Sequence, residues 1–299
     1  MQRGRSAIAL LITLMFVIVI TVAIGYGLGQ VNDASQIVQE ENALYQRNII
    51  VEDILNILRT SKELEVGVDN NSSSDLYLLL SQVAFIPFEY KGVEILLRIK
   101  SARMKFNPAM LTPATGALLS QYLGRYNINA SYIDILFDNI NGIPTDNSYN
   151  STIFDENPYL FRDYIASAKH LERINDFYTK EYHDNALSNV DFSQLFYYTP
   201  DRNISIDVNY ATPEVWEFML GCTRDRAEVL NAAGGSYSEI NDLNLNDDEK
   251  EILTQNFQIS FFEPIVQIDL DITLNGAYTK MSFEYNIQTK KGSNFVYEL

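Results

Sequence analysis

The sequence is poor in the residues that most often carry enzymatic chemistry. Cysteine occurs once, at Cys222, which excludes an intrachain disulfide and a cysteine-rich zinc site. Only His170 and His183 can supply an imidazole that titrates near neutral pH. No phosphate-binding glycine loop, G-x-S-x-G turn or H-E-x-x-H pair is present. We expect no catalytic residues, both histidines at helix surfaces, and Cys222 as a small buried side chain.

Positive charge is also scarce. The chain has 22 Lys and Arg residues against 39 Asp and Glu residues, which gives a formal net charge of -17. Such a surface repels polyanions, so we expect no nucleic-acid partner. The 299 residues are nonetheless enough to bury a sizeable core.

A long apolar run lies near the N-terminus. Residues 7–28 read AIALLITLMFVIVITVAIGYGL and carry no charge. A helix of this length, at about 1.5 Å per residue, spans a bilayer core of about 30 Å. Arg3 and Arg5 precede the run, and the first acidic residue is Asp33. The positive-inside rule therefore predicts a single-pass protein whose short N-terminus is cytoplasmic and whose remaining chain lies outside.

The segment after this run continues the helical pattern. Residues 31–61 contain neither Gly nor Pro and repeat apolar residues at helical spacing, as at Leu44, Ile54 and Leu58. One helix is therefore expected to run from the membrane into a globular domain. Residues 70–74 (NNSSS) predict a polar turn after it, and residues 76–86 and 93–99 predict two strands.

The clearest strand signal is a hairpin at the C-terminal end. Asn275-Gly276 is the preferred two-residue turn, and alternating apolar residues flank it. The predicted register pairs positions whose numbers sum to 551, so Leu270 faces Met281 and Asp271 faces Lys280. Asp269 and Asp271 are thereby assigned to a polar face and not to catalysis.

The middle of the chain predicts short helices joined by glycine turns. Thr212-Pro213-Glu214 predicts a helix starting at Pro213 and ending at Gly221. Thr223 caps a second helix, and acidic residues after Asn246 open a third. Such a module is similar to SAM-like or helix-hairpin-helix domains. DNA binding is disfavoured because the second helix mixes acids with its arginines and the third is strongly acidic.

The leader MQRG followed by RSAIA resembles the class III leader of type IV pilins and pseudopilins. The resemblance implies cleavage by a prepilin peptidase after Gly4, with Arg5 as the first mature residue. The fifth mature residue of that family is normally Glu, whereas this chain has Ala9. The K-type minor pseudopilin of type II secretion (the general secretion pathway protein K family) lacks this Glu.

Shorter internal segments follow the same family in order. Residues 207–212 resemble its I-N-x-N-T-A run, with Asp207 in place of the first Asn. Lys105-Phe106-Asn107 resembles a strand-ending K/R-x-N, Asn157-Pro158-Tyr159 a P-Y, and His170–Ile174 an E-L-x-x-V segment. The implied fold is α+β, with a pilin-like long N-terminal helix packed on an antiparallel sheet and a large inserted α-helical, SAM-like domain.

The implied domains are a leader (1–4), the transmembrane part of the helix (5–29), an amphipathic helix with the first strands (30–106), an inserted helical domain (107–256) and a C-terminal β-hairpin (257–299).

The resemblance also implies calcium, because K-type pseudopilins bind it in their α domain. Asp138 matches the first acid of the family's D-W-x-D motif, whereas Asn141 replaces the second. Calcium accepts carboxylate, amide and carbonyl oxygens. The candidate ligands are Asp134, Asp138, Asn141, Asp146, Asp155 and Glu156. A solvated acidic loop without metal explains the same residues.

The function implied is a structural one: a minor pseudopilin at the tip of the type II secretion pseudopilus, supporting protein export across the outer membrane. The expected partners are I- and J-type minor pseudopilins, the major pseudopilin and the prepilin peptidase, with the sheet edge and the long helix as contact surfaces. The expected location is the bacterial inner membrane, with the globular part in the periplasm. Two alternatives remain: a minor pilin of a type IV pilus or DNA-uptake machine, and a membrane-anchored periplasmic enzyme or sensor.

Overall fold

The computed structural model describes residues 49–61, 64, 73–82, 85–90, 93–145, 148–274 and 277–298. The chain divides into two compact units, Met1–Thr60 and Ser61–Leu299. Gly4, Arg5, Ala9 and the predicted membrane span lie outside the described residues. Among the helices that are described, none has the length and apolar character needed to cross a membrane.

The described part of the first unit is a helix at 49–60. Ile50, Val51, Ile54 and Leu58 are its buried side chains. Their spacing of three or four residues places them on one helix face, as the sequence pattern predicted for this part of the long helix.

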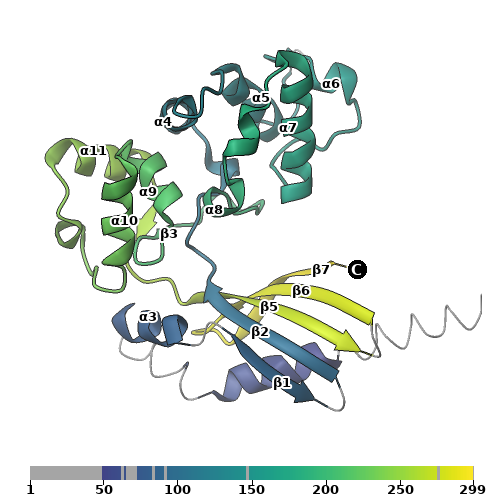
Figure 1. Cartoon of the computed structure of the whole chain (residues 1–299), viewed down its shortest axis with the longest axis vertical. Coiled ribbons are helices and arrows are strands. Elements are labelled where there is room, and N and C mark those ends of the chain that lie inside the picture. Colours follow the sequence, from purple (N-terminus) through teal and green to yellow (C-terminus); the bar gives the residue numbers. More distant parts are fainter. Residues whose placement is uncertain are drawn as a thin grey trace, which may run out of the picture. The chain divides into compact units, whose positions relative to one another are not determined.

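The second unit contains an antiparallel five-stranded sheet (Figure 1). Its strands are β1 (Ile86–Tyr90), β2 (Val93–Ser101), β5 (Ile265–Leu274), β6 (Ala277–Asn286) and β7 (Lys291–Glu298), in the order β1-β2-β5-β6-β7. Buried residues alternate along β2 and β5, and along β6 except at Glu284, which is buried on the polar side. One face of the sheet is therefore apolar and the other is polar.

The predicted C-terminal hairpin register is confirmed. Leu270 pairs with Met281 and Asp271 with Lys280, as the sum rule requires. Leu270 and Met281 are buried, whereas Asp269 and Asp271 lie on the opposite face. The turn residues 275–276 lie outside the described residues.

The predicted strand at 76–86 is wrong over most of its length. Residues Ser73–Gln82 form the helix α3, and only Ile86 of that range belongs to a strand. Leu76 and Leu80 are buried and Leu78 is 56% exposed. A strand would place all three on one face, whereas a helix separates Leu78 from the other two. The segment Ser73–Gln82 contains no β-branched residue, and leucine favours helices.

A helical region separates β2 from β5 in sequence, although these two strands are neighbours in the sheet. Its longer helices are α4 (Pro113–Gly124), α5 (Ser131–Ile140), α7 (Ala168–Tyr182), α9 (Pro213–Leu220), α10 (Arg224–Ala232) and α11 (Asp247–Asn256). Its shorter elements are η1 (Pro108–Met110), α6 (Ile153–Glu156), η2 (Ala186–Asn189), α8 (Phe192–Leu195), η3 (Ile240–Leu243) and the parallel pair β3 (Ile206–Asp207) and β4 (Ile259–Ser260).

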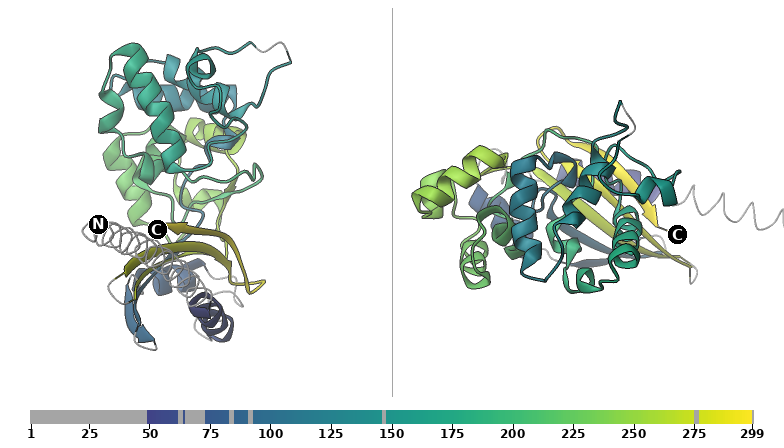
Figure 2. Two further views of the ribbon diagram at one scale, coloured as in Figure 1. Left: turned by 90° about the vertical axis from the view of Figure 1, so that its right-hand side faces the viewer. Right: turned by 90° about the horizontal axis from the view of Figure 1, so that it is seen from above.

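These helices begin where their capping residues predict. Thr212, Thr223 and Asn246 each accept a hydrogen bond from the third residue of α9, α10 and α11, and Gly221 ends α9 with a positive φ of 61°. The predicted helix starts are thus confirmed. α4, α5 and α7 pack together, as do α9, α10 and α11 (Figures 1 and 2). Their buried side chains, Trp216 and Phe218 among them, form one core.

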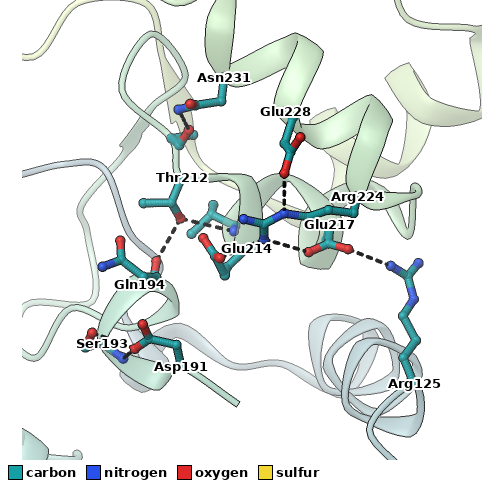
Figure 3. A network of polar contacts seen from close by, with 12 residues as sticks. Arg125, Asp191, Ser193, Gln194, Thr212, Glu214, Glu217, Arg224, Glu228 and Asn231 are labelled. Atoms are coloured by element: carbon teal, nitrogen blue, oxygen red, sulfur yellow. Dashed lines mark hydrogen bonds and ion pairs between the residues drawn. The ribbon is translucent and has the colours of Figure 1, made fainter. Parts of the chain in front are cut away.

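A network of ion pairs joins α4, α9 and α10. Glu217 is buried on α9, where its carboxylate accepts hydrogen bonds from Arg125 at 3.3 Å and from Arg224 at 3.2 Å (Figure 3). Arg224 also contacts Glu214 at 2.6 Å and Glu228 at 2.9 Å. A buried carboxylate is tolerated when it is paired and hydrogen-bonded, so this network has a structural role.

Candidate functional site

The predicted calcium residues are separated in the structure. Asp134, Asn141 and Asp155 are exposed, and Glu156 pairs with Lys180 at 2.6 Å. Asp146 lies outside the described residues. Asp138 is buried, and both its oxygens already accept hydrogen bonds: the backbone and side chain of Asn150 donate to Oδ1 and those of Ser151 donate to Oδ2, at 2.6–3.0 Å.

Asp138 therefore ties α5 to the loop at 150–151 through N–H and O–H donors, and such donors occupy the lone pairs that a cation would need. Among the described side chains, no group of three or more His, Cys, Asp and Glu residues could hold a metal ion. The five described members of the predicted set do not fit a calcium site in this arrangement. Calcium binding stays a prediction.

The histidines and the cysteine do not come together either. His183 ends α7 in the left-handed conformation, with φ of 52°. Cys222 is half-buried beside the carbonyl of Trp216, and burial raises the pKa of its thiol. His170 differs from the expected helix-surface histidine because it is only 8% exposed. Its pKa is lowered, first by burial and then by Arg173.

The polar face of the sheet is lined by ion pairs between neighbouring strands. Arg98 of β2 pairs with Asp271 of β5, and Lys100 pairs with Asp269 at 2.9 Å. A groove of about 480 Å³ follows this face, from Ser193 of α8 across the charged pairs to Val296 of β7. The face is thus charged with both signs, which suits recognition of a polar partner surface more than a small apolar ligand.

The two edges of the sheet are built differently. β1 is a short strand of five residues that contains Pro87, and Glu89 is exposed on it. Proline, charge and short length are the usual protection of a sheet edge. β7 has eight residues, and Phe295, Val296 and Tyr297 are 41%, 52% and 43% exposed. Among the described strands, β7 pairs only with β6, so its outer edge carries free backbone groups next to exposed apolar side chains.

The side chains of β7 lie on both sides of the sheet. The Phe295 ring stacks on Phe283 with centroids 5.1 Å apart, whereas Val296 is opposite Ser282 and lines the charged groove. The pairing of β7 with β6 is irregular between Ser282 and Glu284 of β6, and Asn294 of β7 has a positive φ of 53°. Sequence reasoning named the sheet edge but missed β7 itself. The run FVYE at residues 295–298 was the available signal, because aromatic and β-branched residues favour a strand.

No protein-family model matches the chain, and no curated protein matches it. A solved structure does: the crystal structure of the GspK-GspI-GspJ complex from the enterotoxigenic Escherichia coli type 2 secretion system. The match has a TM-score of 0.52 and 12% identity, and covers 87% of this chain and 99% of the other. The chain therefore shares its fold with a subunit of that minor pseudopilin complex. The predicted resemblance to the K-type subunit is confirmed at the level of the fold.

Proposed function

We propose that this protein is a minor pseudopilin of a type II secretion system and occupies the K-type position at the tip of the pseudopilus. The observation that carries the proposal is the fold match, which extends over 99% of the matched chain. The large helical region between two paired strands is consistent with a structural subunit. The protein would support export across the outer membrane without catalysing a reaction.

The N-terminal sequence supports the tip position. In pilin-like filaments the Glu at the fifth mature position can neutralise the N-terminal amine of the subunit nearer the tip. A lone charge in hydrocarbon is costly, so this pairing favours docking. A tip subunit has no neighbour ahead of it and needs no such Glu, and Ala9 meets that condition.

The edge of β7 is the docking surface that this function requires. Its free backbone groups can pair with an extended segment of a partner, while its exposed side chains supply apolar contact. The partners we propose are the I- and J-type minor pseudopilins, with the major pseudopilin below them. The globular part would lie in the periplasm, anchored to the inner membrane by residues 5–29.

Deletion of the gene tests the function directly. We expect exported proteins to accumulate in the periplasm while pili remain intact. Loss of pili with normal secretion would instead assign the protein to a type IV pilus. A periplasmic enzyme or sensor would leave both unchanged.

Substitution of Gly4 by Val tests the leader. Prepilin peptidase cuts after this glycine in the resembled family, so the Gly4→Val chain should keep its leader and fail to restore secretion. N-terminal sequencing of the membrane form provides the measurement. Met1 at the N-terminus of functional wild-type protein would contradict the proposal.

Substitution of Ala9 by Glu tests the tip position. The new carboxylate would have no amine to pair with, and translocon scales assign an acid in mid-bilayer about 2.5–3.5 kcal/mol of unfavourable free energy. We expect no gain of cross-linking to the other minor pseudopilins. A clear rise would place the subunit inside the filament.

A further inference from the structure

A cavity of about 220 Å³ lies at the start of α7, in a part of the fold that the proposed function does not use. It is a shallow hollow bordered by the segment at 160–167 and the first two turns of the helix. Its lining consists of Leu160, Phe161, Ala166, Ser167, Lys169, His170 and Arg173. None of these residues is acidic, although the chain as a whole has a net charge of -17.

His170 gives this cavity an unsatisfied hydrogen-bond donor. The side chain is only 8% exposed, and its Nδ1 accepts a hydrogen bond from the backbone N–H of Ala166 at 3.1 Å. The neutral ring therefore carries its proton on Nε2. Among the described residues Nε2 has no hydrogen-bond partner. Buried donors without partners are rare in folded proteins and require an explanation.

Two cations border the same cavity. Lys169 and Arg173 are one helical turn apart, and neither forms an ion pair with a described residue. Like charges at this spacing destabilise a helix. By contrast, Lys180 of the same helix is paired with Glu156 at 2.6 Å. The unpaired cations add to the positive N-terminal end of a helix of fifteen residues.

One aromatic side chain, Phe161, lines the cavity. Phe161 is 47% exposed, and its ring centroid lies 6.1 Å from that of His170. Tyr159 is 99% exposed nearby in sequence. A ligand that places an anionic group between the cations would therefore have apolar surface for its aliphatic part.

We propose that this cavity binds a carboxylate group presented by another protein, either an acidic side chain or a chain terminus. One carboxylate oxygen would accept the Nε2–H of His170, and the other would face Lys169 and Arg173. A singly charged anion suits this site, which offers one neutral donor, the Nε2–H of His170, and two exposed cations, Lys169 and Arg173. A phosphate dianion meets stronger repulsion from a chain of this net charge. The site lies outside the sheet, so it is independent of the β7 edge.

Imidazole NMR of the purified full chain tests the proposal, because His170 and His183 are its only histidines. The probes are N-acetylglutamate amide for a side-chain carboxylate, N-acetylglycine for a chain terminus, and inorganic phosphate. We expect at least one carboxylate probe to shift the His170 resonances saturably while His183 stays unchanged. Which carboxylate binds more tightly identifies the source.

Matched substitutions on α7 provide the control. Lys169→Gln and Arg173→Gln should each weaken carboxylate binding roughly tenfold, Lys169→Arg should restore it, and Lys180→Gln should leave it unchanged. The proposal is overturned if no carboxylate probe gives a saturable shift of His170. It is also overturned if phosphate binds as tightly as the carboxylates, or if Lys180→Gln weakens binding as much as Lys169→Gln.

Discussion

The sheet and the helical region of the second unit are stabilised in different ways. The helices are specified locally, by capping residues next to each start, and they enclose their own core. The sheet depends on pairs distant in sequence, such as Arg98 with Asp271, and it has one unprotected edge at β7. The helical region therefore lies between β2 and β5 in sequence without disturbing the sheet, because these two strands still pair directly.

The two segments that connect the sheet to the helical region, one just after β2 and one just before β5, form the joint between them. Contacts in this joint hold the two regions together. Arg103, just after β2, makes two hydrogen bonds to Glu284 of β6, at 3.1 and 3.0 Å, and both side chains are buried. The backbone carbonyl of Arg103 accepts the N–H of Asp207 in β3 at 2.8 Å. The Oδ2 of Asp207 accepts the N–H of Glu263, just before β5, at 2.8 Å. Both connecting segments are thus held by the same small set of contacts.

Removal of one partner of the buried ion pair should have the largest effect. We expect Glu284→Ala to lower the free energy of unfolding by about 3–5 kcal/mol, because it leaves the Arg103 guanidinium buried without its counterion. Chemical denaturation measures the change. Glu156→Ala, which breaks the exposed pair with Lys180, should lower stability far less, because water screens an exposed ion pair. Equal losses in the two variants would contradict a special role for the joint.

Asp207 should make the same joint sensitive to pH. Burial raises the pKa of its carboxyl to about 7, and two backbone hydrogen bonds oppose the rise. The folded state therefore keeps a proton that the unfolded state loses above about pH 4. Stability should fall as pH rises from about 4 to 7, by up to about 4 kcal/mol.

An Asp207→Asn chain tests the assignment of this pH dependence. The variant loses one acceptor, so it should be less stable than wild type near pH 5, by about 1 kcal/mol. Its stability should not fall between pH 4 and 7 through this group. Denaturation curves across this range give the comparison, and a wild-type slope that the substitution leaves unchanged would show that another group is responsible.

Calcium distinguishes the observed arrangement from the family resemblance. The hydrogen bonds that Asp138 accepts predict no stabilisation by calcium, whereas a retained family metal site predicts that calcium stabilises the helical region. At a hundredfold excess over its Kd, a ligand bound only by the folded state adds about 2.7 kcal/mol to stability. If the metal site is retained, the melting temperature of wild type should rise with calcium and that of Asp138→Asn should stay constant. A melting curve that is identical in chelator and in calcium would remove the metal from the account.

The contrast between the two regions also explains what the sequence could predict. The starts of α9, α10 and α11 were predictable because each depends on a cap within a few residues, and the hairpin because alternation and Asn-Gly specify one register. The helix α3 could not be predicted in this way. A short leucine-rich run fits a helix or a strand, and tertiary burial decides between them. Arg103 and Glu284 are 181 residues apart, and no local pattern joins them.

The candidate sites show the same limit. The acidic residues near Asp138 are close in sequence, yet the fold gives this carboxylate to Asn150 and Ser151. The β7 edge and the cavity at His170 depend on which neighbours the fold leaves unpaired, and residue type alone does not reveal that.

Co-purification with the other minor pseudopilins tests whether this chain is a minor pseudopilin that docks through the β7 edge. The full chain would be coexpressed with I- and J-type subunits, as wild type, as Val296→Lys at the β7 edge, and as Val229→Lys on α10, where the valine is 60% exposed. Both substitutions affect exposed valines and should change folding stability by less than about 0.5 kcal/mol. We expect a three-protein complex with wild type and with Val229→Lys, and loss of that complex with Val296→Lys. A chain that forms no complex with either subunit would contradict its assignment as a minor pseudopilin, and an intact complex with Val296→Lys would contradict docking through β7.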